Sequence, residues 1–282
     1  MNRFLKGAMI LTIAGVIVKI IGAFSKVLVA RILGGEGIGL YMMAYPIYQI
    51  IVSISAAGIP VAISIMIAEK LANRDMRGVQ QVFNVSLRVL TLVGIIFSVG
   101  LYASAEWLIQ WNIITDPRAL IPIQLLSPAI IVVTILSCFR GYFQGFQYMV
   151  PTGTSQVFEQ IFRVGSMVGL AYYFIDSGLH LAAGGATFAT FPGVLAGLIV
   201  LVYFYRSQRS LRQQMLSEQN EEAPIERTSA VIKRLFALAI PVSMANIMLP
   251  MVSLIDTFIV PKRLMDIGYY LHEATTQFGY LT

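Results

Sequence analysis

Two lysines lie inside the first long apolar run of the sequence, residues 8–33. Lys19 and Lys26 interrupt a stretch that is otherwise hydrophobic enough to cross a bilayer. A lysine near the middle of a spanning helix costs roughly 2.5 to 3.5 kcal/mol on insertion scales. An ammonium group donates hydrogen bonds and binds anions, phosphate among them. The chemistry that would justify these lysines is the binding of an anion within the membrane.

The spacing of this run separates two faces of a helix. At 100° per residue, apolar side chains fall on one face. The other face is small and cationic: Ala8, Thr12, Gly15, Lys19, Gly22, Lys26 and Ala30. We interpret the apolar face as lipid contact and the other as close helix packing beside a wet, anion-accepting cavity. The alternative is that the lysines snorkel or pair with acidic neighbours, which applies more readily to Lys26 than to the more central Lys19.

A second pair of charges lies in the apolar run at about 153–175. Glu159 and Arg163 are four residues apart, with the acid first, the order that favours an ion pair on a helix. A structural salt bridge between them is one interpretation. The other is that both face a cavity, because charged pairs in membrane helices usually face the bundle interior or water.

The composition identifies a membrane protein that crosses the bilayer several times. Of 282 residues, 57% are hydrophobic and only 12% are charged, whereas about a quarter are charged in soluble domains. The net charge of +6 does not indicate nucleic-acid binding, because the basic residues lie between apolar runs. The single Cys138 excludes an internal disulfide and a multi-cysteine metal site.

Seven apolar runs are long enough to span the bilayer, whose hydrocarbon core is about 30 Å thick. We predict helices at about 8–31, 41–68, 82–105, 120–139, 153–175, 183–205 and 231–259. The fold class is therefore all-α. We expect a six-helix lobe at 1–205, a cytoplasmic linker at 206–230, and at 231–282 the first helix and the start of the next helix of a second lobe. Because an eighth run starts near Glu273, we expect a fragment of a longer protein.

Lysines and arginines in the loops predict the orientation. If the N-terminus is cytoplasmic, twelve of them fall inside and four outside; the four are Arg31, Arg118, Lys262 and Arg263. Several acids fall outside as well: Glu36, Glu106, Asp116, Asp176 and Asp266. The expected location is the cell membrane, with the N-terminus in the cytoplasm.

Prolines and polar residues mark two further runs. Pro46 and Pro60 interrupt the second run, and each removes a backbone donor. Its polar or small face comprises Tyr45, Gln49, Ser53, Ala56 and Pro60, with Tyr41 and Tyr48 nearby. This face lines a cavity, as in the broken helices of transporters, or neighbouring helices absorb the kinks. In the seventh run, Asn246 and Asp256 are the polar candidates for the same cavity.

The sequence contains no pattern for bond-making catalysis. His180 and His272 are isolated, and no phosphate loop or metal-binding cluster of histidines and acids is present. We therefore expect neither an enzyme nor a cofactor or metal. A weak repeat, Gly39-Leu40-Tyr41 against Gly279-Tyr280-Leu281, is consistent with two related lobes.

Several stretches resemble one family. They are KIIGAFSKVLVARILGGEGIGLY at 19–41, RGYFQGFQYMVPT at 140–152, EQIFRV at 159–164, LPMVSLIDTFIVPKRL at 249–264 and EATTQFGYLT at 273–282. Together they resemble the multidrug/oligosaccharidyl-lipid/polysaccharide flippase superfamily, and within it the bacterial polysaccharide biosynthesis or stage V sporulation protein B type.

The resemblance implies two six-helix lobes with the substrate between them and transport by alternating access. It implies a flippase for a lipid-linked oligosaccharide or peptidoglycan-type precursor. The expected partners are an anionic polyprenyl-diphosphate-linked sugar, membrane lipids and, if the protein acts as a scaffold, cell-wall synthesis proteins. Lys19 resembles a basic residue in the first helix of peptidoglycan lipid II flippases. The candidate cavity residues are Lys19, Lys26, Glu159, Arg163, Asn246 and Asp256.

Two other functions remain open at this point. One is a cation-coupled multidrug exporter of the same superfamily, which would need an acidic coupling residue in its cavity. The other is a non-transporting scaffold for cell-wall or spore-envelope synthesis.

Overall fold

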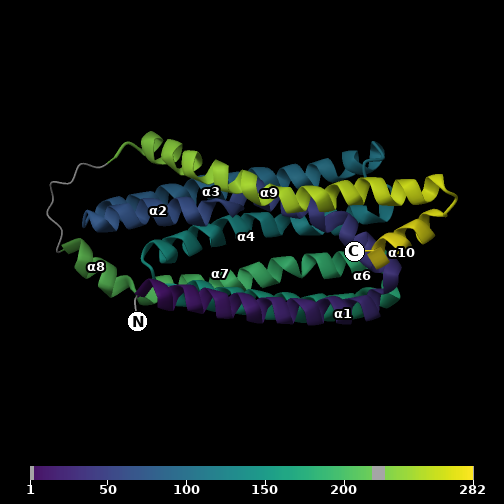
Figure 1. Ribbon diagram of the computed structural model, residues 1–282, viewed down its shortest axis with the longest axis horizontal. Helices are drawn as coiled ribbons and strands as arrows, with labels where there is room; N and C mark the ends of the chain where they lie inside the picture. Colours follow the sequence, from purple (N-terminus) through teal and green to yellow (C-terminus); the bar gives the residue numbers. More distant parts are fainter. Residues whose placement is uncertain (1–2, 218–225, 282) are drawn as a thin grey trace.

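The computed structural model describes residues 3–217 and 226–281 as a bundle of helices. The elements are α1 (Arg3–Val52), η1 (Ser53–Ala57), α2 (Ile59–Ala72), α3 (Met76–Gln110), η2 (Pro117–Ala119), α4 (Leu120–Gly145), α5 (Val150–Phe174), η3 (Ile175–Ser177), α6 (Leu179–Phe188), α7 (Thr190–Ser207), α8 (Arg209–Ser217), α9 (Thr228–Asp266) and α10 (Leu271–Leu281). The N-terminus and α8 lie at one end of the bundle and α10 lies at the other (Figure 1). We call these the α8 end and the α10 end.

Helix α1 consists of two helices that meet at Gly34. This residue has φ 64° and ψ −176°, outside the helical region, in a part of φ/ψ space that glycine enters at little cost. The chain turns back at this point, at the α10 end (Figure 1). The predicted loop between 31 and 41 is therefore wrong: the second helix begins at Gly35. A single glycine makes the turn, so the residues that follow remain helical.

The second run breaks between its two prolines. Pro46 remains inside α1, and the break is the π-helical turn η1 followed by Gly58. Pro60 lies in the first turn of α2, where its missing N–H costs no helical hydrogen bond. A Cβ on Gly58 would lie 2.1 Å from the carbonyl oxygen of Ala239, and the Gly58 N–H donates to Ser243 Oγ at 3.1 Å. The break is thus the place where α9 packs closely.

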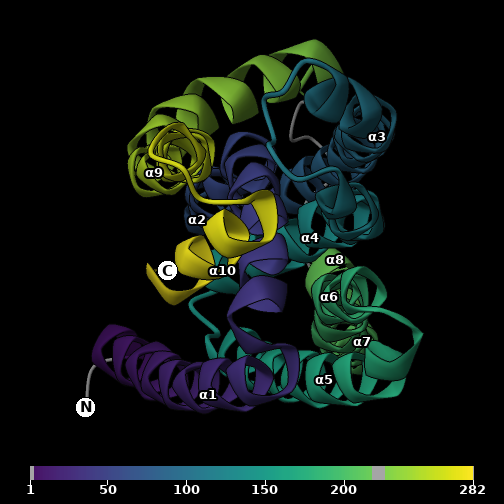
Figure 2. The same ribbon diagram turned by 90° about the vertical axis from the view of Figure 1, so that its right-hand side faces the viewer.

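Helix α4 lies at the centre of the bundle. It packs on α2, α3, α6 and α7, while α5 packs between α1 and α7 (Figure 2). The largest buried cluster joins α2, α3 and α4 through side chains such as Ile63, Phe83 and Phe143. The predicted sixth helix is two helices, α6 and α7, interrupted at Ala189. Helices α1 and α5 pack on each other and form one wall of the site described below.

The predicted linker, 206–230, is only partly described. Helix α7 extends to Ser207, the nine-residue α8 follows, and α9 begins at Thr228. Residues 218–225 of this linker lie outside the described residues. Arg212 of α8 stacks on the ring of Tyr205, 3.7 Å from its centroid, so α8 is attached to α7.

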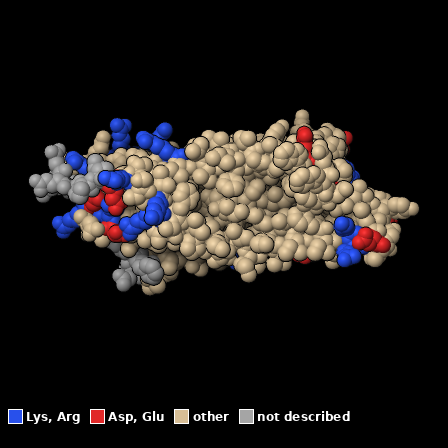
Figure 3. All heavy atoms as spheres, turned by 90° about the horizontal axis from the view of Figure 1, so that it is seen from above, with Lys and Arg blue, Asp and Glu red and all other residues tan. Residues whose placement is uncertain are grey.

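Within the described residues, five segments are long and apolar enough to cross a membrane. They are Leu5–Ala72, Met76–Gln110, Pro117–Gly145, Leu179–Ser207 and Thr228–Asp266. Helix α5, at 25 residues, is also long enough but is more polar. Lysines and arginines gather at the α8 end of the visible face, and the middle of that face is free of charge (Figure 3). The chain is a multi-pass membrane protein.

Candidate functional site: a cationic cavity among α1, α5, α9 and α10

One cavity of about 820 Å³ lies among α1, α5, α9 and α10. Three of the six candidate residues line it: Lys26, Arg163 and Asp256. Its other polar side chains include Gln160 of α5 and Tyr45 and Gln49 of the second half of α1. The break at Gly34 makes this arrangement, because it lets both halves of α1 face the same space.

Lys26 lies in the cavity wall, and Lys19 lies beyond it. Residues 19, 23 and 26 share one helical face, and Ala23 and Lys26 line the cavity. Both lysines are exposed, and Lys19 is about 10 Å from Lys26 along the helix axis, at 1.5 Å per residue. The predicted face is therefore present, but only the part of it that contains Lys26 lines the cavity with α9 and α10.

Arg163 enters the cavity without the predicted salt bridge to Glu159. The Glu159 carboxylate instead binds Arg140 of α4, with 2.8 Å between Oε2 and Nη2. Arg163 donates from Nη2 to Oε1 of Gln160, a side chain that is only 3% exposed. Among the described residues, no carboxylate lies within 4.0 Å of Arg163 or of Lys26. Glu159 lies outside the cavity wall because α4 supplies a better-placed cation.

The two candidates in α9 take different positions. Asp256 is exposed and lines the cavity beside Ser253 and Thr257. Asn246 is exposed but lies outside the cavity wall, and its amide donates to the Val242 carbonyl at 2.8 Å. The Thr257 hydroxyl donates to the Ser253 carbonyl of its own helix at 2.8 Å and lies 3.4 Å from the Met42 carbonyl, so this part of α9 packs against α1.

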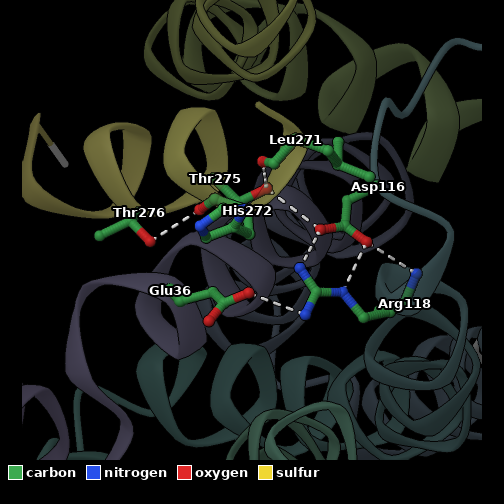
Figure 4. Close-up of polar contacts among 7 residues, drawn as sticks. All are labelled: Glu36, Asp116, Arg118, Leu271, His272, Thr275 and Thr276. Atoms are coloured by element: carbon green, nitrogen blue, oxygen red, sulfur yellow. Dashed lines mark hydrogen bonds and ion pairs between the residues drawn. The ribbon is translucent and has the colours of Figure 1, made fainter. Parts of the chain in front are cut away.

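An ion-pair network lies at the α10 end. From the sequence alone, its charged residues are expected only as loop residues on the outer side. The Arg118 guanidinium donates two hydrogen bonds to Asp116, at 3.0 and 2.7 Å, and the Arg118 backbone N–H donates a third at 3.0 Å. Arg118 Nη1 also lies 2.8 Å from Glu36 Oε1. Asp116 is fully buried and also accepts a hydrogen bond from Thr275 Oγ1 at 3.1 Å (Figure 4). The network therefore joins α1, the turn before α4 and α10. The sequence contains one sign of a structural role for Asp116: it comes directly before Pro117, a pattern typical of a helix start.

Glycines allow α1 and α10 to cross at backbone distance beside this network. A Cβ on Gly39 would lie 2.1 Å from the Thr275 carbonyl oxygen, and one on Gly279 would lie 1.9 Å from that of Gly35. Small residues four apart on both helices are a common device for close crossing in membranes. The two segments of the weak sequence repeat therefore contact each other. Because Gly35 and Gly279 also line the cavity, this crossing borders it at the α10 end.

A charged cavity within a bundle of membrane-spanning helices is common in membrane transporters. The fold agrees: the inward-facing structure of a multidrug resistance MATE family transporter of the MOP superfamily matches with a TM-score of 0.68 at 16% identity, over 92% of this chain and 56% of that one. The chain belongs to the polysaccharide biosynthesis protein family, whose profile matches residues 4–270. This confirms the family and the all-α fold class expected from the sequence.

Two curated relatives come from Bacillus subtilis. Stage V sporulation protein B is 30% identical over 281 residues, which are all of this chain and 53% of the relative. Lipid II flippase MurJ is 27% identical over 286 residues, 98% of this chain and 52% of the relative. The chain spans about half the length of the curated relatives it matches.

Proposed function

We propose that this chain is part of a flippase that moves a lipid-linked oligosaccharide or peptidoglycan-type precursor across the cytoplasmic membrane by alternating access. The observation that carries the proposal is the pair Lys26 and Arg163, two cations in one cavity with no carboxylate within 4.0 Å among the described residues. The lipid II flippase among the relatives supports it. In this proposal the protein catalyses no bond-making reaction and needs no cofactor.

The physical chemistry of the cavity favours an anionic headgroup. Arg163 is only partly exposed, and a cation partly removed from water attracts a phosphate more strongly than the same charge in water, where the dielectric constant is high. Arg163 is also held in place by Gln160, so little further ordering is needed when the anion binds. A diphosphate would therefore bind Lys26 and Arg163 while its polyprenyl chain stays in the lipid.

The closed crossing at the α10 end supports alternating access. If the N-terminus is cytoplasmic, as the loop charges predict, the α10 end faces outward and the network of Glu36, Asp116, Arg118 and Thr275 closes the outer side. Export requires this crossing to separate.

Asp256 favours a second candidate, a cation-coupled multidrug exporter. Its carboxylate lines the same cavity, where a positively charged drug or a coupling ion would bind. Against this candidate, two cations line that cavity, and they would repel an organic cation. A non-transporting scaffold is the third candidate. Among the described residues, no contact favours a scaffold over a transporter.

A transport assay separates the three candidates. The protein from its native reading frame is reconstituted in liposomes with fluorescent undecaprenyl-diphosphate disaccharide, and its appearance in the opposite leaflet is followed. Ethidium efflux under an imposed sodium or proton gradient is measured in parallel. We expect lipid transfer without ethidium efflux. Gradient-driven ethidium efflux without lipid transfer supports the exporter, and absence of both supports the scaffold.

A further inference from the structure

Three polar side chains form a row along one wall of the cavity. Tyr41, Tyr45 and Gln49 all line it, and their spacing of four residues places them on one face of α1. The row is about 12 Å long, at 1.5 Å per residue. The cations lie elsewhere in the wall, Lys26 before the break at Gly34 and Arg163 on α5. The cavity therefore has a cationic part and a neutral polar part.

The tyrosine rings of this row pack against one another. The rings of Tyr41 and Tyr45 stack with centroids 5.3 Å apart and an angle of 18° between their planes. Tyr45 lies against Tyr48 on its other side, with centroids 5.9 Å apart. Tyr41 thus covers one face of the Tyr45 ring, and Tyr48 lies against it at a tilt of 37°. The stack also restrains the rings, so their positions are set before any ligand binds.

The hydroxyl groups have unused hydrogen-bonding capacity. Tyr41 is only 8% exposed, and buried polar groups are normally paired. Within the part of the chain that the structure describes, no protein group bonds to the hydroxyls of Tyr41 and Tyr45 or to the amide of Gln49. None of these atoms is among the fully enclosed atoms that lack a partner, so each keeps some accessible surface on a residue that lines the cavity.

The chemistry of this row matches a carbohydrate. A tyrosine hydroxyl and a glutamine amide can each donate and accept a hydrogen bond. A phosphate oxygen only accepts, whereas a sugar hydroxyl does both. We infer that Tyr41, Tyr45 and Gln49 form a saccharide subsite that binds the sugar units of the substrate. This inference rests on the proposed function, in which Lys26 and Arg163 bind the diphosphate.

The test compares two lipids and three variants. The protein from its native reading frame is purified, and binding is measured for undecaprenyl diphosphate and for undecaprenyl-diphosphate disaccharide. Tyr41→Phe/Tyr45→Phe removes two hydroxyls, and Gln49→Leu removes the amide. Tyr48→Phe is the matched control, because Tyr48 belongs to the same stack but does not line the cavity.

We expect the wild-type protein to bind the disaccharide lipid more tightly than the sugar-free lipid. The double variant and Gln49→Leu should weaken disaccharide binding on the order of tenfold, the effect of losing one or two hydrogen bonds. Sugar-free binding should stay within twofold, and Tyr48→Phe should change neither. Equal losses for both lipids, no loss for either, or no wild-type preference for the sugar would overturn the inference. If the wild-type protein binds neither lipid, the proposed function itself fails.

Discussion

Glu159 of α5 pairs with Arg140 of α4 at 2.8 Å and leaves Arg163, four residues further along α5, without a carboxylate partner among the described residues. This choice of partner determines the charge of the cavity. An ion pair within α5 would have neutralised Arg163, whereas the pair between helices joins α4 to α5 and keeps the second cation available. The cationic cavity thus depends on a residue, Arg140, that does not line it.

Breaking this pair should reduce stability. Both side chains are mostly buried, with 16% and 18% exposed. In Glu159→Gln, Arg140 loses its charged partner, which should cost about 1 to 3 kcal/mol and lower the unfolding temperature in detergent. The double variant Arg140→Gln/Glu159→Gln should recover part of the loss. Removing the exposed pair with Arg263→Gln should have no measurable effect, since those side chains are 78% and 52% exposed.

The Glu159→Gln variant also tests whether the protein is a cation-coupled exporter. If Glu159→Gln leaves the unfolding temperature unchanged but abolishes transport, Glu159 is a coupling residue and its pairing with Arg140 is not structural. That outcome would favour the cation-coupled exporter.

Substitutions in the network at the α10 end should reduce stability by different amounts. Arg118→Gln would leave the fully buried Asp116 carboxylate without its cation, and breaking a buried pair in this way costs on the order of 3 to 5 kcal/mol. Glu36 is 28% exposed, so Glu36→Gln should cost about 1 kcal/mol or less. Thermal unfolding of the purified variants measures both. Equal effects would mean that Asp116 is not the centre of the network.

The glycine crossing should control access to the cavity from the α10 side. In Gly279→Ala, the added Cβ would lie 1.9 Å from the Gly35 carbonyl oxygen, so α1 and α10 must separate. A cysteine at Ser253, in a Cys138→Ala background, should then react faster with a membrane-impermeant maleimide added on the α10 side. Gly165→Ala is the control, because its Cβ would meet nothing within 4 Å. Unchanged labelling in Gly279→Ala would show that the crossing is not the closure.

The helices could be predicted from the sequence because each apolar run is long and is interrupted by charge. The break at Gly34 could not, since the glycine-rich segment that follows also fits a loop. Gly35 and Gly39 pack closely against α10, and that partner comes from more than 230 residues further along the chain. A short-range pattern contains no information about such a contact.

The site was predictable to a similar degree. Helical spacing placed Lys19 and Lys26 on one face, but only the positions of α9 and α10 decide which part of that face is enclosed. Spacing also favoured Glu159 with Arg163, because the competing Arg140 belongs to a different helix. Polarity alone makes Asn246 a candidate cavity residue, but its amide donates a hydrogen bond to its own helix. The polar face of Tyr45 and Gln49 was visible in the sequence, and the structure places both in the cavity.

The central claim is that Lys26 and Arg163 bind the anionic headgroup during transfer between leaflets. The most direct test is the leaflet-resolved flipping assay on Lys26→Gln/Arg163→Gln, with Arg88→Gln as a control that removes an exposed cation outside the cavity. We expect the double variant to fold and to lose at least tenfold in rate, since each lost charged hydrogen bond is worth about 1.5 to 3 kcal/mol, while the control keeps the wild-type rate. A folded double variant that flips the lipid at the wild-type rate would contradict the account.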